Sequence, residues 1–435
     1  MTALFQRVLM KNEGRPDALR LPAYRDQGGY EMLRKAMDMA PADLVNLVDD
    51  AQMRGRGGAG FSMGRKWKFV PPKDKVPKPT YLAINADEGE PGTFKDRWIL
   101  ENDPHLMLEG IAIACWALQC HKAFIYIRGE FVRQIQVVRT AVQECYEAGI
   151  FGRSMLGREF EVDVVVHQGA GAYICGEETG LLSSIEGKAG QPTVKPPFPA
   201  VSGLWASPTI INNVETLAAL PDMLRMGLPE WLALGDPKHG GTKLYSISGH
   251  VRRPGVYEAR HDVTLRALIY DDAYCQGLRE GRTLKGVIPG GSSSPVLLPD
   301  QIDIPMTFDS LKAAGSMLGS AGAIVLDDTT DMVAVATRTA KFYWHESCGQ
   351  CTPCREGTGW MYRILKTIRD GQGAKSDLDL ILEICDQIEG GRTICALADG
   401  TAMPIRAFVK KYRQEFEDYI DRGGPAPDLQ RFATH

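Results

Sequence analysis

The chain has 435 residues, of which 44% are hydrophobic and 24% are charged. This length exceeds the size at which a single hydrophobic core stops growing, so we expect two or three domains. A formal net charge of −4 offers no basic surface to a nucleic acid or to an anionic lipid. No stretch of the sequence is long and apolar enough to span a membrane. The composition therefore argues for an ordinary globular protein and against a nucleic-acid-binding or membrane-spanning one.

Helical and strand-like patterns alternate over residues 28–241. Residues 44–51 carry apolar side chains at the spacing of one helical face, and Asp103 before Pro104 is typical of a helix cap and first turn. Such alternation predicts a parallel sheet flanked by helices, which is an α/β fold. The expected elements are helices beginning at Pro41 and Pro104 and over 131–147, and strands over 81–84, 124–127 and 162–166.

The pattern changes twice further along the chain. Between about residues 242 and 330, short strands surround one short helix, which predicts a small α+β module. From residue 331 onward the pattern is mostly helical, which predicts a helical bundle. We therefore expect domains over 1–241, 242–330 and 331–435. The expected elements are strands over 244–248, 255–257, 286–288 and 323–326, and helices over 264–269, 332–343, 360–368, 378–388 and 405–416.

A glycine-rich loop, residues 54–61, follows the first of these helices. A dinucleotide-binding turn lies between a strand and a helix, so this loop is not a standard Rossmann turn. Glycines nevertheless let a backbone approach a flat ring or a pyrophosphate, and they leave amide groups free for anionic oxygens. A merely flexible turn is the alternative interpretation. The candidate residues here, including two that add positive charge, are Gly55, Arg56, Gly57, Gly58, Gly60, Phe61 and Lys66.

Polar and glycine-rich segments follow the expected strands. Residues 85–90 contain an amide and three carboxylates at the edge where open α/β sheets bind ligands, although a surface turn is the alternative. Residues 169–178 form a second glycine-rich turn, and residues 212–216 open a helix whose first-turn amides can hold a phosphate. Together these segments predict a nucleotide or flavin pocket. Its candidate residues are Asn85, Asp87, Glu88, Glu90, Gly176, Glu177, Glu178, Asn212, Asn213 and Thr216.

Four of the ten cysteines have the spacing of cluster ligands. Cys348, Cys351 and Cys354 have C-x2-C-x2-C spacing, and Cys395 is a distant fourth ligand. This pattern is typical of a [4Fe–4S] cluster, whereas a zinc site normally shows two separated pairs. A cluster is therefore favoured over zinc, and His345 is a possible further ligand that we expect only to end a helix. Cys175 is expected to be buried beside the pocket rather than to be a ligand or a nucleophile, and Cys275 has no partner pattern. The cysteines expected to be packing residues of helices, without chemistry, are Cys115, Cys120, Cys145 and Cys385.

Taken together, these segments resemble the flavin subunit of NADH:quinone oxidoreductase, respiratory complex I. The matching segments are residues 55–67, 85–92, 169–178, 212–216 and 346–357, together with Cys395. The resemblance implies a Rossmann-like parallel-sheet domain for FMN and NADH, then a small β-grasp domain of ubiquitin-like type, then a helical bundle that carries the cluster. It also implies which residues surround FMN. These are Gly55, Gly57, Lys66, Asn85, Asp87, Glu88, Gly176, Glu177, Asn212, Asn213 and Thr216.

The same resemblance implies a place for NADH over the flavin. The resemblance places the adenine between aromatic residues that correspond to Phe61, Phe69 and Phe198 in this chain. It places Glu90 and Glu178 near the nicotinamide half. The nicotinamide would deliver a hydride to FMN, and the cofactor would supply the chemistry, so no side chain is expected to act as an acid or a base. Single electrons would then leave through the [4Fe–4S] cluster.

The expected function is therefore that of an NADH dehydrogenase subunit whose electrons reach quinone through partner subunits. The implied partners are a small thioredoxin-like [2Fe–2S] subunit and a large multi-cluster subunit, at the cytoplasmic side of a bacterial inner membrane. The nearest alternative is the diaphorase subunit of an NAD-linked hydrogenase or formate dehydrogenase, which shares the three modules. A non-catalytic zinc or scaffold protein is the alternative from a different class.

Overall fold

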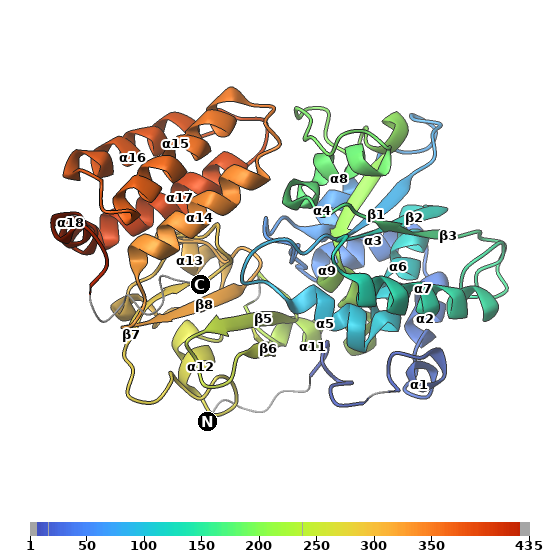
Figure 1. The fold of residues 1–435 in the computed structure, drawn as a ribbon. Helices are drawn as coiled ribbons and strands as arrows, with labels where there is room; N and C mark the ends of the chain where they lie inside the picture. The colour runs from blue at the N-terminus through green and yellow to red at the C-terminus, as the bar shows by residue number, and fades with distance from the viewer. Residues whose placement is uncertain (1–6, 16, 237, 427–435) are drawn as a thin grey trace.

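A computed structural model describes residues 7–15, 17–236 and 238–426. It contains two four-stranded sheets followed by a group of C-terminal helices. Figure 1 shows the first sheet and its helices on one side of the molecule, and the second sheet and the C-terminal helices on the other. The α/β fold with a parallel sheet that the sequence predicts is confirmed for the first sheet.

The first sheet is parallel throughout and has the strand order β3-β2-β1-β4. Three strands match the expected runs, but the sequence does not indicate β4, because only Thr209 to Ile211 precede two asparagines. Since the strands are parallel, their carboxyl ends meet at one edge of the sheet. The strands are β1 (Tyr81–Ala86), β2 (Lys122–Ile127), β3 (Asp163–Gln168) and β4 (Thr209–Asn213).

Helices cover both faces of this sheet. Leu181 and Leu182 of α8 pack with Ala83 of β1 on one face, whereas Leu82 and Ile84 of the same strand belong to the core on the other face. The alternation follows from the opposite directions of successive side chains in a strand. The helices are α1 (Leu21–Arg25), α2 (Glu31–Met37), α3 (Pro41–Asp50), α4 (Met63–Lys68), α5 (Lys95–Asn102), α6 (Pro104–Leu118), α7 (Val132–Glu147), α8 (Glu178–Ile185), α9 (Val214–Ala218), α10 (Leu220–Met226) and α11 (Leu228–Ala233).

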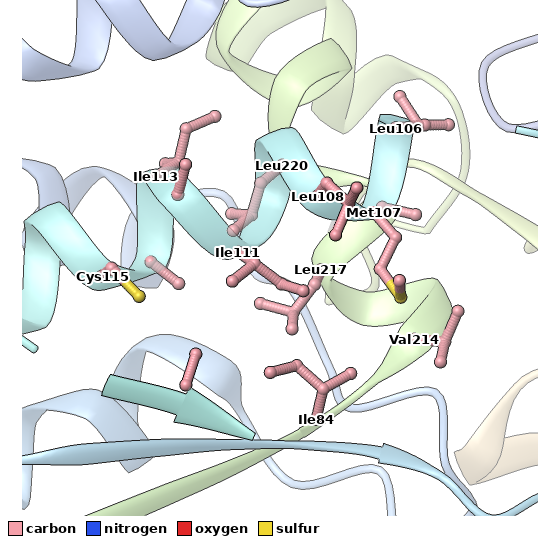
Figure 2. Close-up of a cluster of buried hydrophobic side chains, with 14 of the residues drawn as sticks. Ile84, Leu106, Met107, Leu108, Ile111, Ile113, Cys115, Val214, Leu217 and Leu220 are labelled. Carbon is pink, nitrogen blue, oxygen red and sulfur yellow. The ribbon is translucent and has the colours of Figure 1, made fainter. Parts of the chain in front are cut away.

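Helix α6 forms the centre of the first core and is buried almost all round. Figure 2 shows Ile111 of α6 close to Ile84 of β1 and Leu217 of α9. Gly110 permits this approach, because a Cβ atom there would lie 2.0 Å from the carbonyl oxygen of Leu217. The packing of α6 therefore fixes where α9 begins, at the carboxyl edge of the sheet.

The start of α6 at Pro104 matches the sequence prediction, but the expected cap is wrong. Asp103 makes no capping hydrogen bond through its side chain. Its Oδ2 instead accepts a hydrogen bond from Asn12 Nδ2 at 2.6 Å, because the N-terminal segment folds back over this end of the helix. The sequence carries no signal for so distant a partner.

The second sheet is mixed and has the order β6-β5-β8-β7, in which only β5 and β8 are parallel. Ile247, Leu268, Val287 and Val325 belong to its own hydrophobic core. All four strands contain the expected runs, and the helix α12 begins one residue later than expected, because Thr264 is its N-cap. The elements are β5 (Thr242–Gly249), β6 (Gly255–Arg260), β7 (Leu284–Ile288), β8 (Gly322–Asp327), α12 (Leu265–Tyr270) and α13 (Phe308–Ala313).

Five helices follow, and they share a core that includes Tyr343, Met361 and Phe408. The sequence prediction of one helix over 405–416 is wrong, because the chain leaves helical geometry at Tyr412, whose φ is −117°. The helices are α14 (Met332–Glu346), α15 (Thr352–Arg369), α16 (Lys375–Ile388), α17 (Leu397–Lys411) and α18 (Arg413–Arg422).

Over the part of the chain that the structure describes, every helix is either too short or too polar to cross a lipid bilayer.

Candidate functional site

Several loops meet at the carboxyl edge of the first sheet. Asp87 follows β1 directly, the 3-10 turn Tyr173–Gly176 and α8 follow β3, and α9 follows β4. Asn85 Nδ2, near the end of β1, donates to the carbonyl oxygen of Gly176 at 2.8 Å, which joins the carboxyl end of β1 to the turn after β3. The parallel sheet thus brings together segments that lie far apart in the sequence.

The glycine-rich loop lies against the start of α9. The amide of Arg56 donates to Thr216 Oγ1 at 3.0 Å, and a Cβ atom at Gly57 would lie 3.2 Å from Asn213 Cβ. Gly60 has a φ of +63°, a conformation that favours glycine. Within the described chain the amides of residues 57–60 donate to no acceptor. The loop therefore presents free donors beside the first turn of a helix, which suits an anionic group.

Asp87 has the most unusual environment of the predicted residues. Its Oδ2 is buried and has no hydrogen-bond partner among the described residues. Burial, opposed by Arg128 and reinforced by Glu130 and Glu346, raises the pKa of Asp87 to about 7. An unpaired buried carboxylate oxygen is costly in a folded protein, so this atom is poised to accept a hydrogen bond from a ligand.

Replacing Asp87 by asparagine is expected to stabilise the flavin-free chain at pH 8 by a few kcal/mol. The folded pKa lies above the unfolded value of about 3.9, so stability is lost as pH rises from about 4 to about 7, and the cost is complete above that range. Urea denaturation at pH 5.5 and pH 8 checks this, since the advantage of the variant should be larger at pH 8. A variant less stable than the wild type at pH 8 would contradict the assignment.

Two predicted side chains are already engaged inside the protein. The guanidinium of Arg56 is 2% exposed and lies 3.2 Å from Glu215 Oε1. Glu88 is buried and accepts hydrogen bonds from the amides of Asp96 and Arg97 at 2.7 and 3.2 Å, so it holds the first turn of α5. Burial and the neighbouring Asp96 raise the pKa of Glu88 to about 7. The Arg56 charge therefore points into the protein interior rather than toward a ligand.

Glu215 is a functional candidate that the sequence did not indicate. It is fully buried, and its carboxylate lies 2.9 Å from Lys95 Nζ and 3.8 Å from Lys243 Nζ, in addition to Arg56. Its Oε1 also accepts the amide of Leu244 in β5 at 2.9 Å. Although burial opposes ionisation, the three cations lower the pKa of Glu215 to about 2. One carboxylate thus joins the glycine-rich loop, α5, α9 and the second sheet.

A chain of four charges borders the site. Lys66 lies 3.1 Å from Glu178, and Lys195 lies 3.0 Å from both Glu178 and Glu177. Glu177 also accepts the amides of Thr179 and Gly180, so it caps α8. Three of the four charged residues are sequence candidates, but Lys195 is a lone lysine before two prolines and gives no signal of its own.

Glu90 lies where all three parts of the chain meet. It accepts hydrogen bonds from Tyr173 OH at 2.7 Å, from Ser293 Oγ in the second-sheet region at 2.7 Å, and from Tyr343 OH of α14 at 3.3 Å. The sequence indicates Glu90 but not Ser293 or Tyr343, nor Ser292, whose Oγ is a fourth hydroxyl donor at 3.4 Å. Its carboxylate is therefore held firmly at the border of the site.

Trp67 and three phenylalanines complete the surroundings. Trp67 Nε1 donates to Asn212 Oδ1 at 3.0 Å, which fixes that amide at the end of β4. Phe61, Phe69 and Phe198 are 50%, 55% and 58% exposed, and the rings of Phe61 and Phe69 lie 6.1 Å apart. Exposed aromatic rings are well suited to stack on a base, and Phe61 belongs to the glycine-rich loop.

The four cluster candidates lie in the segment that leads into α15 and in the loop before α17. Cys348 and Cys351 precede α15, Cys354 is in its first turn, and Cys395 lies just before α17. The amide of Ile394 lies 3.4 Å from Cys351 Sγ, so the loop of the fourth cysteine adjoins the other three. Burial raises the pKa of the Cys395 thiol to about 11, and the nearby thiols of Cys354 and Cys348 add to this rise. The structure therefore brings the predicted ligands together.

The described residues contain no group of three or more His, Cys, Asp or Glu that could hold one metal ion. Thiolates of a cubane each bind a different iron, so they stand further apart than the ligands of one ion. His345 ends α14 as expected, and its side chain is 80% exposed. The six cysteines without assigned chemistry are all buried: Cys115, Cys120, Cys145, Cys175, Cys275 and Cys385.

The residues at the carboxyl edge fit a flavin nucleotide. Free loop amides and the first turn of α9 suit its phosphate, and the unpaired oxygen of Asp87 suits a hydroxyl or a ring N–H. Residues 48–222 match the model of the Nuo51 FMN-binding domain, and residues 334–419 match the iron–sulfur binding region of NADH-ubiquinone oxidoreductase-F. Fold and site together define a flavoprotein oxidoreductase that also carries an iron–sulfur cluster.

Relatives of known name specify the family. The chain is 50% identical over 419 residues to the F 2 subunit of NADH-quinone oxidoreductase from Rhizobium meliloti, covering 96% of this chain and 98% of the relative. It is 46% identical to the F subunit from Mycobacterium bovis, covering 96% and 94%. The chain belongs to the family of NADH-quinone oxidoreductase F subunits. A solved NAD+-reducing [NiFe]-hydrogenase is also similar, with a TM-score of 0.82 and 31% identity over 97% of this chain and 67% of that one.

Proposed function

We propose that this chain oxidises NADH at a bound FMN and passes single electrons to a [4Fe–4S] cluster held by Cys348, Cys351, Cys354 and Cys395. The observation that carries the proposal is the adjacency of the two sites. Gln191 Nε2, from the loop beside the flavin-type pocket, donates to the carbonyl oxygen of Cys348 at 3.4 Å. When bound, FMN accepts a hydride from NADH and releases electrons one at a time, which the cluster accepts singly.

The residues of the chain bind and orient, and none needs to transfer a proton. The amides of residues 57–60 and the first turn of α9 hold the phosphate, while Asp87 and Asn85 bind hydroxyls or the ring edge. Lys66 and Glu177 border the same pocket. Holding two reacting groups in register removes much of the entropic barrier to hydride transfer.

NADH would bind on the open side of the pocket. Phe61, Phe69 and Phe198 offer exposed rings for the adenine, and Glu90 and Glu178 would lie near the nicotinamide half. Because Glu90 is held by four hydroxyl groups, it offers a fixed acceptor rather than a mobile one. Fixed acceptors recognise a ligand at a smaller cost in side-chain entropy.

We also propose three domains, over 1–241, 242–330 and 331–435. Separate hydrophobic cores support this division, and the mixed second sheet with α12 supports a β-grasp type for the middle domain. The helices α14 to α18 would form the bundle that carries the cluster. Electrons must leave the chain, so the partners would be other complex I subunits, including a thioredoxin-like [2Fe–2S] subunit and a large multi-cluster subunit, on the cytoplasmic side of a bacterial inner membrane.

A diaphorase role is the second candidate, because the NAD+-reducing [NiFe]-hydrogenase shares the fold at a TM-score of 0.82. The higher identity to the NADH-quinone oxidoreductase relatives, over nearly their whole length, favours the quinone-linked role. Reconstitution separates the two, since quinone-linked NADH oxidation should appear with complex I subunits and hydrogen-linked NAD+ reduction should not appear with hydrogenase subunits.

Replacing Phe198 by alanine tests the proposed NADH site. The variant should show a KM for NADH raised by about tenfold with ferricyanide as acceptor, because one aromatic stacking contact is lost. FMN content, measured by fluorescence of the released flavin, should stay unchanged. Tyr270→Ala removes another exposed ring, from α12, and serves as the control. Loss of flavin without a change in the KM for NADH would show that Phe198 contacts FMN rather than NADH. Absence of NADH oxidation in the wild type would refute the proposed function.

A further inference from the structure

Two hydrogen bonds connect the segments after β3 and after α8 to the segment around Cys348, the first of the cluster cysteines. Glu346 Oε2, at the end of α14, accepts the backbone amide of Tyr173 at 3.1 Å. Gln191 Nε2 donates to the carbonyl oxygen of Cys348 at 3.4 Å. We call these contacts the two clamps. They cross between the segments that flank the two cofactor sites, and neither Glu346 nor Gln191 is a ligand candidate.

Tyr173 is fixed at its ring as well as at its backbone. Its ring meets the rings of Phe342 and Tyr343 edge-on, with centroids 5.2 and 5.9 Å apart, and its hydroxyl donates to Glu90 at 2.7 Å. The turn that carries Tyr173 continues directly to Gly176 at the flavin-type pocket. A movement of this turn relative to α14 would therefore change the separation of the two sites.

The carboxylate of Glu346 is partly buried and acts on the charge of Asp87. Its side chain is 19% exposed, and it adds to the rise of the pKa of Asp87 toward about 7, so it lies close enough to disfavour a second negative charge in the pocket. A residue that only covered the surface could be neutral or pointed away. The clamp to Tyr173 gives a physical reason for a partly buried acceptor at this position.

We propose that Glu346 and Gln191 are positioning residues that keep the gap between flavin and cluster constant, and so set the rate at which electrons cross it. The proposal rests on the proposed function and adds residues to it. In the reaction with ferricyanide, each NADH gives NAD+, one proton released to solvent and two electrons. Two ferricyanide ions each accept one of these electrons.

The test uses the full chain loaded with FMN and cluster. Glu346→Ala removes the acceptor, Glu346→Gln keeps an acceptor oxygen, and Gln191→Ala opens the other clamp from the flavin side. Glu356→Ala is the matched control, because it removes a carboxylate near the same cysteines whose partner is the exposed Arg355. Freeze-quench EPR follows cluster reduction after mixing with NADH. Hydrogen exchange at the amide of Tyr173, flavin content and the midpoint potential of the cluster are measured alongside.

Glu346→Ala should slow cluster reduction by about tenfold or more, since small displacements between reacting groups cost large rate factors. Its Tyr173 amide should exchange faster, while flavin content and the midpoint potential match the Glu356→Ala control. Glu346→Gln should recover most of the rate, and Gln191→Ala should also be slow. Wild-type rates in both alanine variants, despite faster exchange at Tyr173, would overturn the proposal, as would equal slowing by Glu356→Ala. If the wild-type cluster is not reduced by NADH at all, the proposed function itself fails.

Discussion

Replacing Glu215 by glutamine is expected to lower the free energy of unfolding by about 3–5 kcal/mol, because it removes the anion that contacts all three buried cations. Lys95 keeps Asp96 as a partner at 2.8 Å, but Arg56 loses its carboxylate. Lys243, whose Nζ has no described hydrogen-bond acceptor even beside Glu215, loses the carboxylate 3.8 Å away that opposes the lowering of its pKa by burial to about 7. An uncompensated buried charge is among the few defects that cost this much. Urea denaturation followed by circular dichroism measures the change.

The control for Glu215 is Glu417→Gln. Glu417 pairs with Arg413 on α18 at 2.9 Å, and the two side chains are 25% and 38% exposed. A pair of this kind contributes at most about 1 kcal/mol, because water already solvates both partners. If both variants lose the same small free energy of unfolding, Glu215 does not stabilise the three buried cations, and its central role is wrong.

A functional consequence accompanies the loss of stability in Glu215→Gln. Arg56 is the residue through which the glycine-rich loop is tied to the protein interior, by its guanidinium to Glu215 and by its amide to Thr216. Releasing the guanidinium from Glu215 leaves its hydrogen bond to the carbonyl oxygen of Gly240 at 3.3 Å and the amide bond to Thr216. We therefore expect weaker retention of FMN in the folded fraction of this variant than in the Glu417 control.

The sequence predicts the fold where local periodicity carries it. Strands of the second sheet and the helix α6 follow from apolar spacing and from Pro104. The strand β4 is not predicted, because a five-residue strand that ends in two asparagines has almost no hydrophobic pattern. The break at Tyr412 is not predicted either, because neither glycine nor proline marks it, and the helices on each side pack against the same core.

The residues of the candidate site likewise fall into those that the sequence indicates and those that it does not. Glycine-rich turns and the cysteine spacing are visible in the sequence because backbone geometry and metal ligation each demand one residue type. Glu215, Lys195 and Glu346 are ordinary charged residues whose meaning lies in partners far along the chain. For the same reason the direction of the Arg56 side chain could not be read from its position between two glycines.

Replacing Cys351 by serine is expected to abolish the [4Fe–4S] cluster while FMN remains bound. Cys351 precedes the first residue of α15, and its sulfur lies 3.4 Å from the amide of Ile394, next to Cys395 in the chain. A serine oxygen is a poor replacement for a thiolate at iron. Loss of the EPR signal after reduction, with loss of bound iron and sulfide, measures the effect.

Cys385→Ala provides the matched control for Cys351→Ser. Cys385 is a fully buried cysteine of α16, and its Sγ lies 3.6 Å from Met361 Sδ, so the change costs packing but removes no expected ligand. The control should keep its EPR signal and iron content even if it unfolds at a lower temperature. An unchanged signal in Cys351→Ser would exclude Cys351 as a ligand, and zinc in place of iron and sulfide in the wild type would exclude the cluster. Because flavin content depends on loops at the other site, its retention in Cys351→Ser separates loss of the cluster from general unfolding.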